Sequence, residues 1–145
     1  MYSKPEIMER MRLTRASCRA ELEFWNNITF LVESTGSAKG MVCDMIREAA
    51  ESDTRILCIS AEDKAESLEV RWVIRQAERK MIVIEHADLL LTDEMRRYIA
   101  FDKTNQYLIM GRNTDSLLLS RANLYELDVA SDGVRTKIRL KNYRG

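Results

Sequence analysis

The first third of the chain switches from a strand-like to a helix-like hydrophobic pattern. Over residues 12–24 apolar and charged positions partly alternate, which is typical of an amphipathic β-hairpin with one buried face. The run Ile28–Val32 is almost continuously β-branched or apolar and favours a strand that is buried on both faces. Over residues 41–50 apolar positions recur at helical spacing and leave Asp44, Arg47, Glu48 and Glu51 on the opposite, polar face of the predicted helix. We therefore expect a hairpin, a buried strand, a loop and a helix.

The rest of the chain continues this order and ends in a second hairpin. Further strands are predicted at residues 55–60, 81–85 and 106–110, and helices at residues 65–80 and directly after Thr92. Thr92 suits the N-cap position of its helix. Residues 124–129 and 134–140 alternate around Ser131, Asp132 and Gly133, which is a hairpin signal.

Four apolar strands separated by helices predict an α/β fold. Parallel neighbours need long crossover connections, and these are right-handed and cover a face of the sheet. We expect one domain over residues 1–145, with a mainly parallel sheet flanked by helices and a β-hairpin at each end of the chain. Ligands of such sheets bind at the carboxyl ends of the strands.

Charge and cysteine content exclude several classes of protein. Lys plus Arg and Asp plus Glu both number 23, so no global field attracts nucleic acid or membrane. Cys18, Cys43 and Cys58 are widely spaced and accompany a single histidine, which predicts reduced, packed thiols and no zinc site. No segment has the apolar run of a signal peptide or membrane helix, so we expect a cytoplasmic protein that does not bind membranes.

The loop after Ile28–Val32 carries a candidate phosphate-binding motif. Residues 33–40 read Glu-Ser-Thr-Gly-Ser-Ala-Lys-Gly and lead directly into a predicted helix. They resemble the G-x-x-x-x-G-K-[ST] loop of P-loop NTPases, in which backbone N–H groups, a helix N-terminus and a lysine hold phosphates. The resemblance implies a phosphate-binding set of five residues: Gly36, Ser37, Ala38, Lys39 and Gly40.

Three positions of the loop depart from the motif. Glu33 replaces the first glycine, and a carboxylate about 4 Å from a phosphate charge costs ~4 kcal/mol at an effective dielectric constant near 20. Ala38 replaces the last glycine, where left-handed geometry would cost roughly 1 to 2 kcal/mol. Gly40 replaces the Ser or Thr that binds magnesium, so the sequence gives no metal ligand set and Mg²⁺ binding is not expected.

The strand at residues 81–85 resembles a Walker B segment, in which four apolar residues precede two acidic ones. Glu85 stands at the metal-organising position and His86 where a water-activating Glu would lie, so the resemblance makes Glu85 and His86 the catalytic candidates. A histidine can act as a base near neutral pH. The alternative is that His86 is an ordinary polar residue at a strand end.

The strand at residues 106–110 is followed by Arg112 and Asn113, whose place resembles the sensor position that reads a terminal phosphate. Arg112 is a plausible anion contact. The alternative is that this strand end emerges into solvent.

Together the order of elements and motifs over about residues 27–113 resembles small P-loop proteins of the ABC and AAA+ type, which implies a three-layer P-loop NTPase-like fold. Two features depart from those families. About twenty residues separate the second and third parallel strands, which leaves no space for an ABC helical insert, and the C-terminal part is rich in strands where an AAA+ protein has a helical lid.

Three functions remain open. The first is a degenerate P-loop domain with a regulatory or interaction role, a protein partner or a second copy, and at most weak binding of ATP, another nucleotide or an anion. The second is an active ATPase or phosphotransferase that uses Lys39, Glu85, His86 and Arg112.

The third function is nucleic-acid binding through five basic residues near the C-terminus: Arg135, Lys137, Arg139, Lys141 and Arg144. Against this third function, charged residues on an edge strand also prevent aggregation, and the sequence favours that interpretation.

Overall fold

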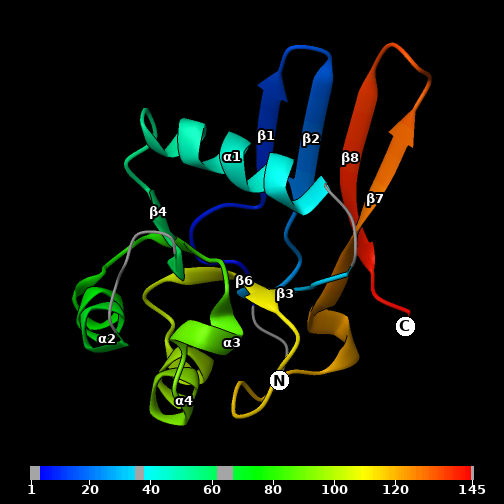
Figure 1. Ribbon diagram of the computed structural model, residues 1–145. Helices are drawn as coiled ribbons and strands as arrows, with labels where there is room; N and C mark the ends of the chain where they lie inside the picture. Colours follow the sequence, from blue (N-terminus) through cyan, green and yellow to red (C-terminus); the bar gives the residue numbers. More distant parts are fainter. Residues whose placement is uncertain (1–3, 35–37, 62–66, 145) are drawn as a thin grey trace.

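The computed structural model describes residues 4–34, 38–61 and 67–144, and within them the chain forms one eight-stranded mixed sheet with four α-helices (Figure 1). The strands are ordered β1 (Arg10–Arg15), β2 (Cys18–Glu23), β8 (Thr136–Asn142), β7 (Leu124–Ser131), β3 (Ile28–Val32), β6 (Gln106–Gly111), β5 (Met81–Ile84) and β4 (Ile56–Ile59). The helices are α1 (Ala38–Ala50), α2 (Ser67–Gln76), α3 (Ala87–Leu90) and α4 (Asp93–Phe101), and a 3-10 helix (Arg121–Asn123) precedes β7. The α/β class is confirmed.

The sheet has two halves of different character. In one half β3, β6, β5 and β4 are parallel neighbours, and β7 joins them in parallel beside β3. In the other half two antiparallel hairpins, β1–β2 and β7–β8, stand side by side because β2 and β8 pair in parallel. Both terminal hairpins are thus confirmed. Helix α1 crosses the first hairpin, and the tips of both hairpins extend past the helix on the same side (Figure 1).

Alternating side chains divide the interior into two cores, one on each face of the sheet. On one face, Leu31 and Val83 pack with the apolar side of α1 and with the inward side of the N-terminal hairpin. On the other face, Phe30 and Ile82 pack with α2, α3 and α4. Adjacent residues of one strand thus belong to different cores, as strand geometry requires. Each face of the parallel half is covered by helix.

Several local predictions agree with the structure and others do not. The strand Ile28–Val32 has the predicted bounds, and Thr92 caps α4 by accepting a hydrogen bond from the backbone N–H of Met95 at 3.2 Å. The second helix ends at Gln76, short of the predicted residue 80, and Arg79 adopts a left-handed conformation with φ of 58°. The short helix α3 was not predicted, because four residues carry too little periodicity.

The proposed role of the basic C-terminal strand as a protected edge is wrong. β8 lies inside the sheet between β2 and β7, and the edges are β1 and β4. The pairing of the first hairpin with the second joins segments far apart in the sequence, and local hydrophobic patterns cannot predict such pairing. The charges on β8 therefore need another explanation.

Buried amide side chains tie the amino ends of the central strands to the N-terminal segment. Gln106 is fully buried, and its Oε1 accepts hydrogen bonds from the backbone N–H groups of Ile7 and Met8 at 2.9 and 2.8 Å. Its Nε2 donates to the Met8 carbonyl at 2.9 Å. Nearby, the amide of Asn27 donates to the Asn105 carbonyl at 2.8 Å. Gln106 thus replaces the strand partner that residues 7 and 8 lack.

Substitution of Gln106→Ala should destabilise the protein by about 2 to 3 kcal/mol, because it leaves buried backbone groups without partners. Urea unfolding followed by circular dichroism measures the change. The exposed Arg97→Ala is the control and should stay within about 0.5 kcal/mol of the unsubstituted protein. A loss below about 1 kcal/mol for Gln106→Ala would show that this amide does not hold the N-terminal segment.

Candidate functional site

The carboxyl ends of β3, β6 and β5 lie level with one another and form the floor of the candidate site. Val32 pairs with Gly111, and Ile84 pairs with Ile109 two residues earlier on the same strand. The backbone N–H of Glu33 donates to the Gly111 carbonyl at 2.9 Å, so the ladder continues one residue beyond β3. The structure thereby brings the loops after all three strands to one edge of the sheet.

Lys39 and Glu33 form an ion pair across the mouth of the loop. Lys39 Nζ lies 2.6 Å from Glu33 Oε1, and the two side chains are 28% and 23% exposed. The lysine that resembles the phosphate-binding residue therefore already has an anionic partner. That partner comes from the position where the motif has its first glycine.

The remaining loop positions divide between the described and undescribed parts of the chain. Gly36 and Ser37 lie outside the described residues. Ala38 and Gly40 belong to the first turn of α1. A Cβ added at Gly40 would meet no atom within 4 Å, so the helix has space there for the hydroxyl-bearing side chain that the motif normally carries.

A second ion pair engages the Walker B-like residue. Glu85 is 5% exposed, and its Oε2 accepts a hydrogen bond from Arg47 Nη2 at 2.5 Å. Arg47 also donates from Nη1 to Asp44 at 2.7 Å. A buried carboxylate requires such a partner, since desolvation penalises an isolated charge. Arg47 was predicted to face solvent on the far side of its helix, but its long side chain reaches back to the sheet.

Cys43 lies between the two ion pairs on the same stripe of α1. Lys39, Cys43 and Arg47 are spaced four residues apart and so share one face of the helix. Burial, together with the neighbouring Glu85 carboxylate, raises the pKa of the Cys43 thiol to about 12, and Lys39 and Arg47 oppose the rise. The thiol also contacts the Met110 sulfur at 3.3 Å. This cysteine is a neutral packing group, as predicted, and not a nucleophile at neutral pH.

His86 holds a strained position directly after β5. Its backbone is left-handed, with φ of 56° and ψ of 41°, and it caps α3 without a side-chain hydrogen bond. His86 Nδ1 is buried and has no hydrogen-bond partner among the described residues. Histidine tolerates this backbone region better than most residues, although the conformation costs roughly 1 to 2 kcal/mol. The prediction that His86 activates a nucleophile is not tested by this geometry.

The loop after β6 is built around Asp88. Its carboxylate accepts hydrogen bonds from the backbone N–H groups of Arg112 and Asn113 at 3.1 and 3.0 Å. The buried Arg96 lies 3.7 Å from the same carboxylate and donates to the Asn113 carbonyl at 2.5 Å. A Cβ at Gly111 would lie 2.7 Å from Asp88 Oδ1, so only glycine allows this close approach. The sequence pattern gave no sign of this organising role for Asp88 and Arg96.

The sensor-like residues contribute mainly their backbone to this turn. The Arg112 side chain is exposed. The side-chain oxygen of Asn113 accepts a hydrogen bond from the backbone N–H of Asp115 at 2.9 Å, which forms a local turn. Arg112 is therefore available to an incoming anion, whereas the Asn113 oxygen is already engaged.

Two of the residues that resemble catalytic charges, Lys39 and Glu85, are neutralised by neighbours from the same chain. No group of three or more His, Cys, Asp or Glu side chains in the described ranges is placed to hold a metal ion. The described helices include none that is long and apolar enough to cross a bilayer.

Comparison with protein-family models, with curated proteins and with solved structures found no match.

Removal of the Arg47 guanidinium should destabilise the protein, because the buried Glu85 carboxylate loses its partner. We expect Arg47→Met to cost about 2 kcal/mol in urea unfolding and the double variant Arg47→Met/Glu85→Gln to recover at least half of that loss. Arg12→Ala removes an exposed pair with Glu21 and should change stability by less than about 1 kcal/mol. If the double variant is no more stable than Arg47→Met alone, the two side chains are not energetically coupled.

The raised pKa of Cys43 predicts a loss of stability at alkaline pH. Folding favours the protonated thiol, so the contribution is complete below the ordinary pKa of 9.0 and disappears as pH rises toward about 12. Each pH unit in that window should remove about 1.4 kcal/mol. Urea unfolding at pH 8, 9, 10 and 11 measures the slope, which should be shallower in Cys43→Ala. Equal slopes in the two proteins would contradict the assignment.

Proposed function

We propose that this chain is a degenerate P-loop NTPase-like domain with a regulatory or interaction role, which binds nucleotides or anions weakly at most. The observation that carries the proposal is the pairing of Lys39 with Glu33 and of Glu85 with Arg47. In an active site of this family the lysine would bind phosphate and the acidic residue would help to bind a metal ion. Here each of the two side chains forms an ion pair with another residue of the same chain.

The topology of the parallel half supports a P-loop origin. The chain leaves β3 through α1 over one face of the sheet and reaches the distant β4, while α2 and α4 return over the opposite face. β3 and β6 are therefore neighbours whose following segments diverge, which is the kind of switch point where α/β sheets bind ligands. The insertion of β6 between β3 and β5 also agrees with the resemblance to the ABC and AAA+ type.

The energetics of the first pair explain why nucleotide binding should be weak. A phosphate that approaches Lys39 must displace Glu33 or lie close to its carboxylate, at a cost of about 4 kcal/mol for charges 4 Å apart at an effective dielectric constant near 20. That cost corresponds to roughly a thousandfold loss of affinity. Lys39 thus holds an internal carboxylate where an active enzyme would hold substrate.

The energetics of the second pair argue against hydrolysis. For Glu85 to hold a magnesium ion, Arg47 would have to break its ion pair with Glu85, and Gly40 has no hydroxyl group to act as a ligand. The competing function, an active ATPase or phosphotransferase that uses Glu85, His86 and Arg112, requires both pairs to open in the presence of substrate. The proposal and this competitor therefore differ in how tightly the unsubstituted protein binds Mg-ATP.

Substitution of Glu33→Gln should release Lys39 and increase affinity for ATP and for pyrophosphate at least tenfold. Isothermal titration calorimetry at 100 mM salt, with and without magnesium, measures both ligands against the unsubstituted protein. The matched control is Glu51→Gln, which makes the same charge change at an exposed position and should leave affinity within twofold. Lys39→Ala in the Glu33→Gln background should abolish the gain.

Two results would contradict the proposal. If the unsubstituted protein binds ATP with micromolar affinity only when magnesium is present, and Lys39→Ala abolishes this binding, the active-enzyme function is favoured. If Glu33→Gln gains no affinity for either ligand although circular dichroism shows it to be folded, the loop does not form an anion cradle and the P-loop origin loses its main functional support.

A further inference from the structure

The outer face of the hairpin half carries rows of charge that cross neighbouring strands. In one row Arg12 pairs with Glu21 at 3.1 Å, and Arg139 lies 3.7 Å from Asp128. The strand register places Glu21 opposite Arg139, so positive and negative side chains alternate across four strands. Opposite charges on facing strand positions stabilise one another. This row is internally balanced.

The same balance holds further along the hairpin β7–β8. Lys141 lies 3.6 Å from Glu126 on the neighbouring strand. The basic C-terminal residues that suggested a nucleic-acid face from sequence are therefore partly neutralised, since Arg139 and Lys141 both have acidic partners.

The row at the hairpin tips is different, because no acidic residue lies opposite its cations on the neighbouring strands. Arg19 on β2 lies directly opposite Lys137 on β8, and the flanking positions on β1 and β7 are Thr14 and Ala130. Arg135, just before β8, adds a third cation on the same side. Within the described residues none of the three cations forms an ion pair, and all three are exposed.

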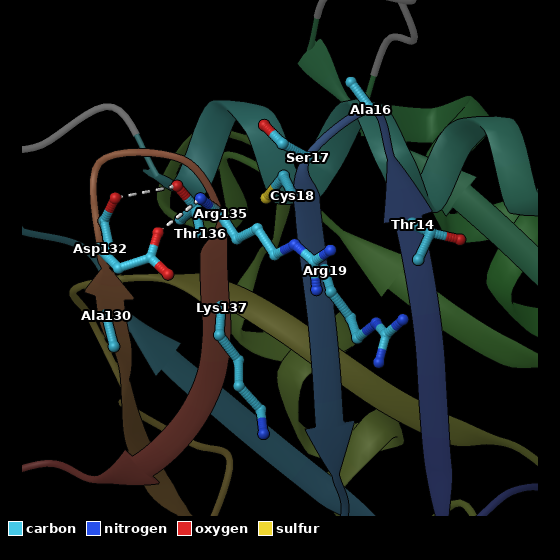
Figure 2. A pocket seen from close by; sticks show the side chains of 11 residues that line it. Thr14, Ala16, Ser17, Cys18, Arg19, Ala130, Asp132, Arg135, Thr136 and Lys137 are labelled. Atoms are coloured by element: carbon cyan, nitrogen blue, oxygen red, sulfur yellow. Dashed lines mark hydrogen bonds between the residues drawn. The ribbon is translucent and has the colours of Figure 1, made fainter.

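These cations line an open groove of about 630 Å³ between the two hairpin tips. Figure 2 shows Arg19 and Lys137 on the side of the strands away from α1, with Arg135 above them at the tip. Hydroxyl-bearing residues also line the groove, among them Ser17 in the hairpin turn and Thr14, which lies opposite Arg19 in the same row. The arrangement unites two hairpins that are far apart in the sequence.

Asp132 is the one acidic residue among the described residues that line the groove. Its carboxylate accepts hydrogen bonds from the backbone N–H groups of Val134 and Arg135 at 2.9 and 2.7 Å, and these bonds lower its pKa. It therefore closes the hairpin turn. Three cations against one carboxylate leave the groove with a net charge of +2 in a chain whose total charge is zero.

We propose that this groove binds the phosphodiester backbone of double-stranded nucleic acid. Exposed cations and hydroxyl groups are the side chains that contact phosphate oxygens, and such contacts do not depend on base sequence. Among the described residues no aromatic side chain lines the groove, whereas binding of single strands relies on rings that stack against bases. Its open shape suits an extended polyanion.

Contacts with three phosphates fix the expected salt dependence. The logarithm of the association constant should fall with the logarithm of salt concentration with a slope near −2.7, because each neutralised phosphate contributes about −0.9. A rise from 50 to 200 mM salt should then weaken binding about fortyfold. The inference is independent of the proposed P-loop origin, since none of its residues belongs to the candidate site.

Fluorescence anisotropy with a labelled 20-base-pair duplex tests the proposal at 50, 100 and 200 mM salt. The triple variant Arg19→Ala/Arg135→Ala/Lys137→Ala should bind at least tenfold more weakly at 50 mM salt, with a slope between 0 and −1. Two control variants each remove one cation outside the groove: Lys141→Ala from a paired position on β8 and Arg97→Ala from α4. Both should bind within twofold of the unsubstituted protein, and circular dichroism confirms that all variants fold.

Several outcomes would overturn the proposal. It fails if 100 μM protein does not bind the duplex at 50 mM salt, or if the triple variant binds as tightly as the controls. A single-stranded oligonucleotide of the same sequence that binds more tightly than the duplex would overturn the assignment to double-stranded nucleic acid. Equal affinity for poly-glutamate would show that the groove recognises negative charge and not the phosphodiester backbone.

Discussion

The Arg47–Glu85 ion pair is the interaction on which the candidate site depends. A carboxylate at the buried end of β5 cannot remain unpaired in an apolar interior, so a cation must accompany it. Arg47 supplies that charge from α1, which connects the helix to the sheet at the edge where ligands of α/β proteins bind. The same pairing sets the surroundings of Cys43. The need to neutralise the buried Glu85 carboxylate thereby fixes the position of α1 against the end of β5, with the Cys43 thiol between them.

Much of the fold could be predicted because local periodicity reports burial directly. The strand Ile28–Val32 and the N-cap at Thr92 were both evident from short stretches of sequence. Both hairpins followed from alternation and turn residues. The carboxyl edge of the parallel strands likewise follows from chain direction once the strands are known, which is why Lys39 and Glu85 were predicted to lie at the same edge of the sheet.

The remainder depends on contacts between distant segments, which local patterns do not encode. Arg47 was assigned to solvent by its position on the helix, yet its long side chain reaches a carboxylate on β5. β8 was expected at an edge, but its parallel pairing with β2 places it inside the sheet. Arg19 was therefore not grouped with Lys137. In each case the chemistry of the residue was evident and its partner was not.

The parallel pairing of β2 with β8 has a consequence for the order of assembly. Strand β2 is synthesised well before β8, which is one of its two neighbours in the sheet. During translation the first hairpin therefore has one side uncovered until β8 has emerged, and bringing such remote strands together is slow. Until then, β2 presents unsatisfied backbone groups to other nascent chains. The alternating charges along its outward side would discourage such premature association.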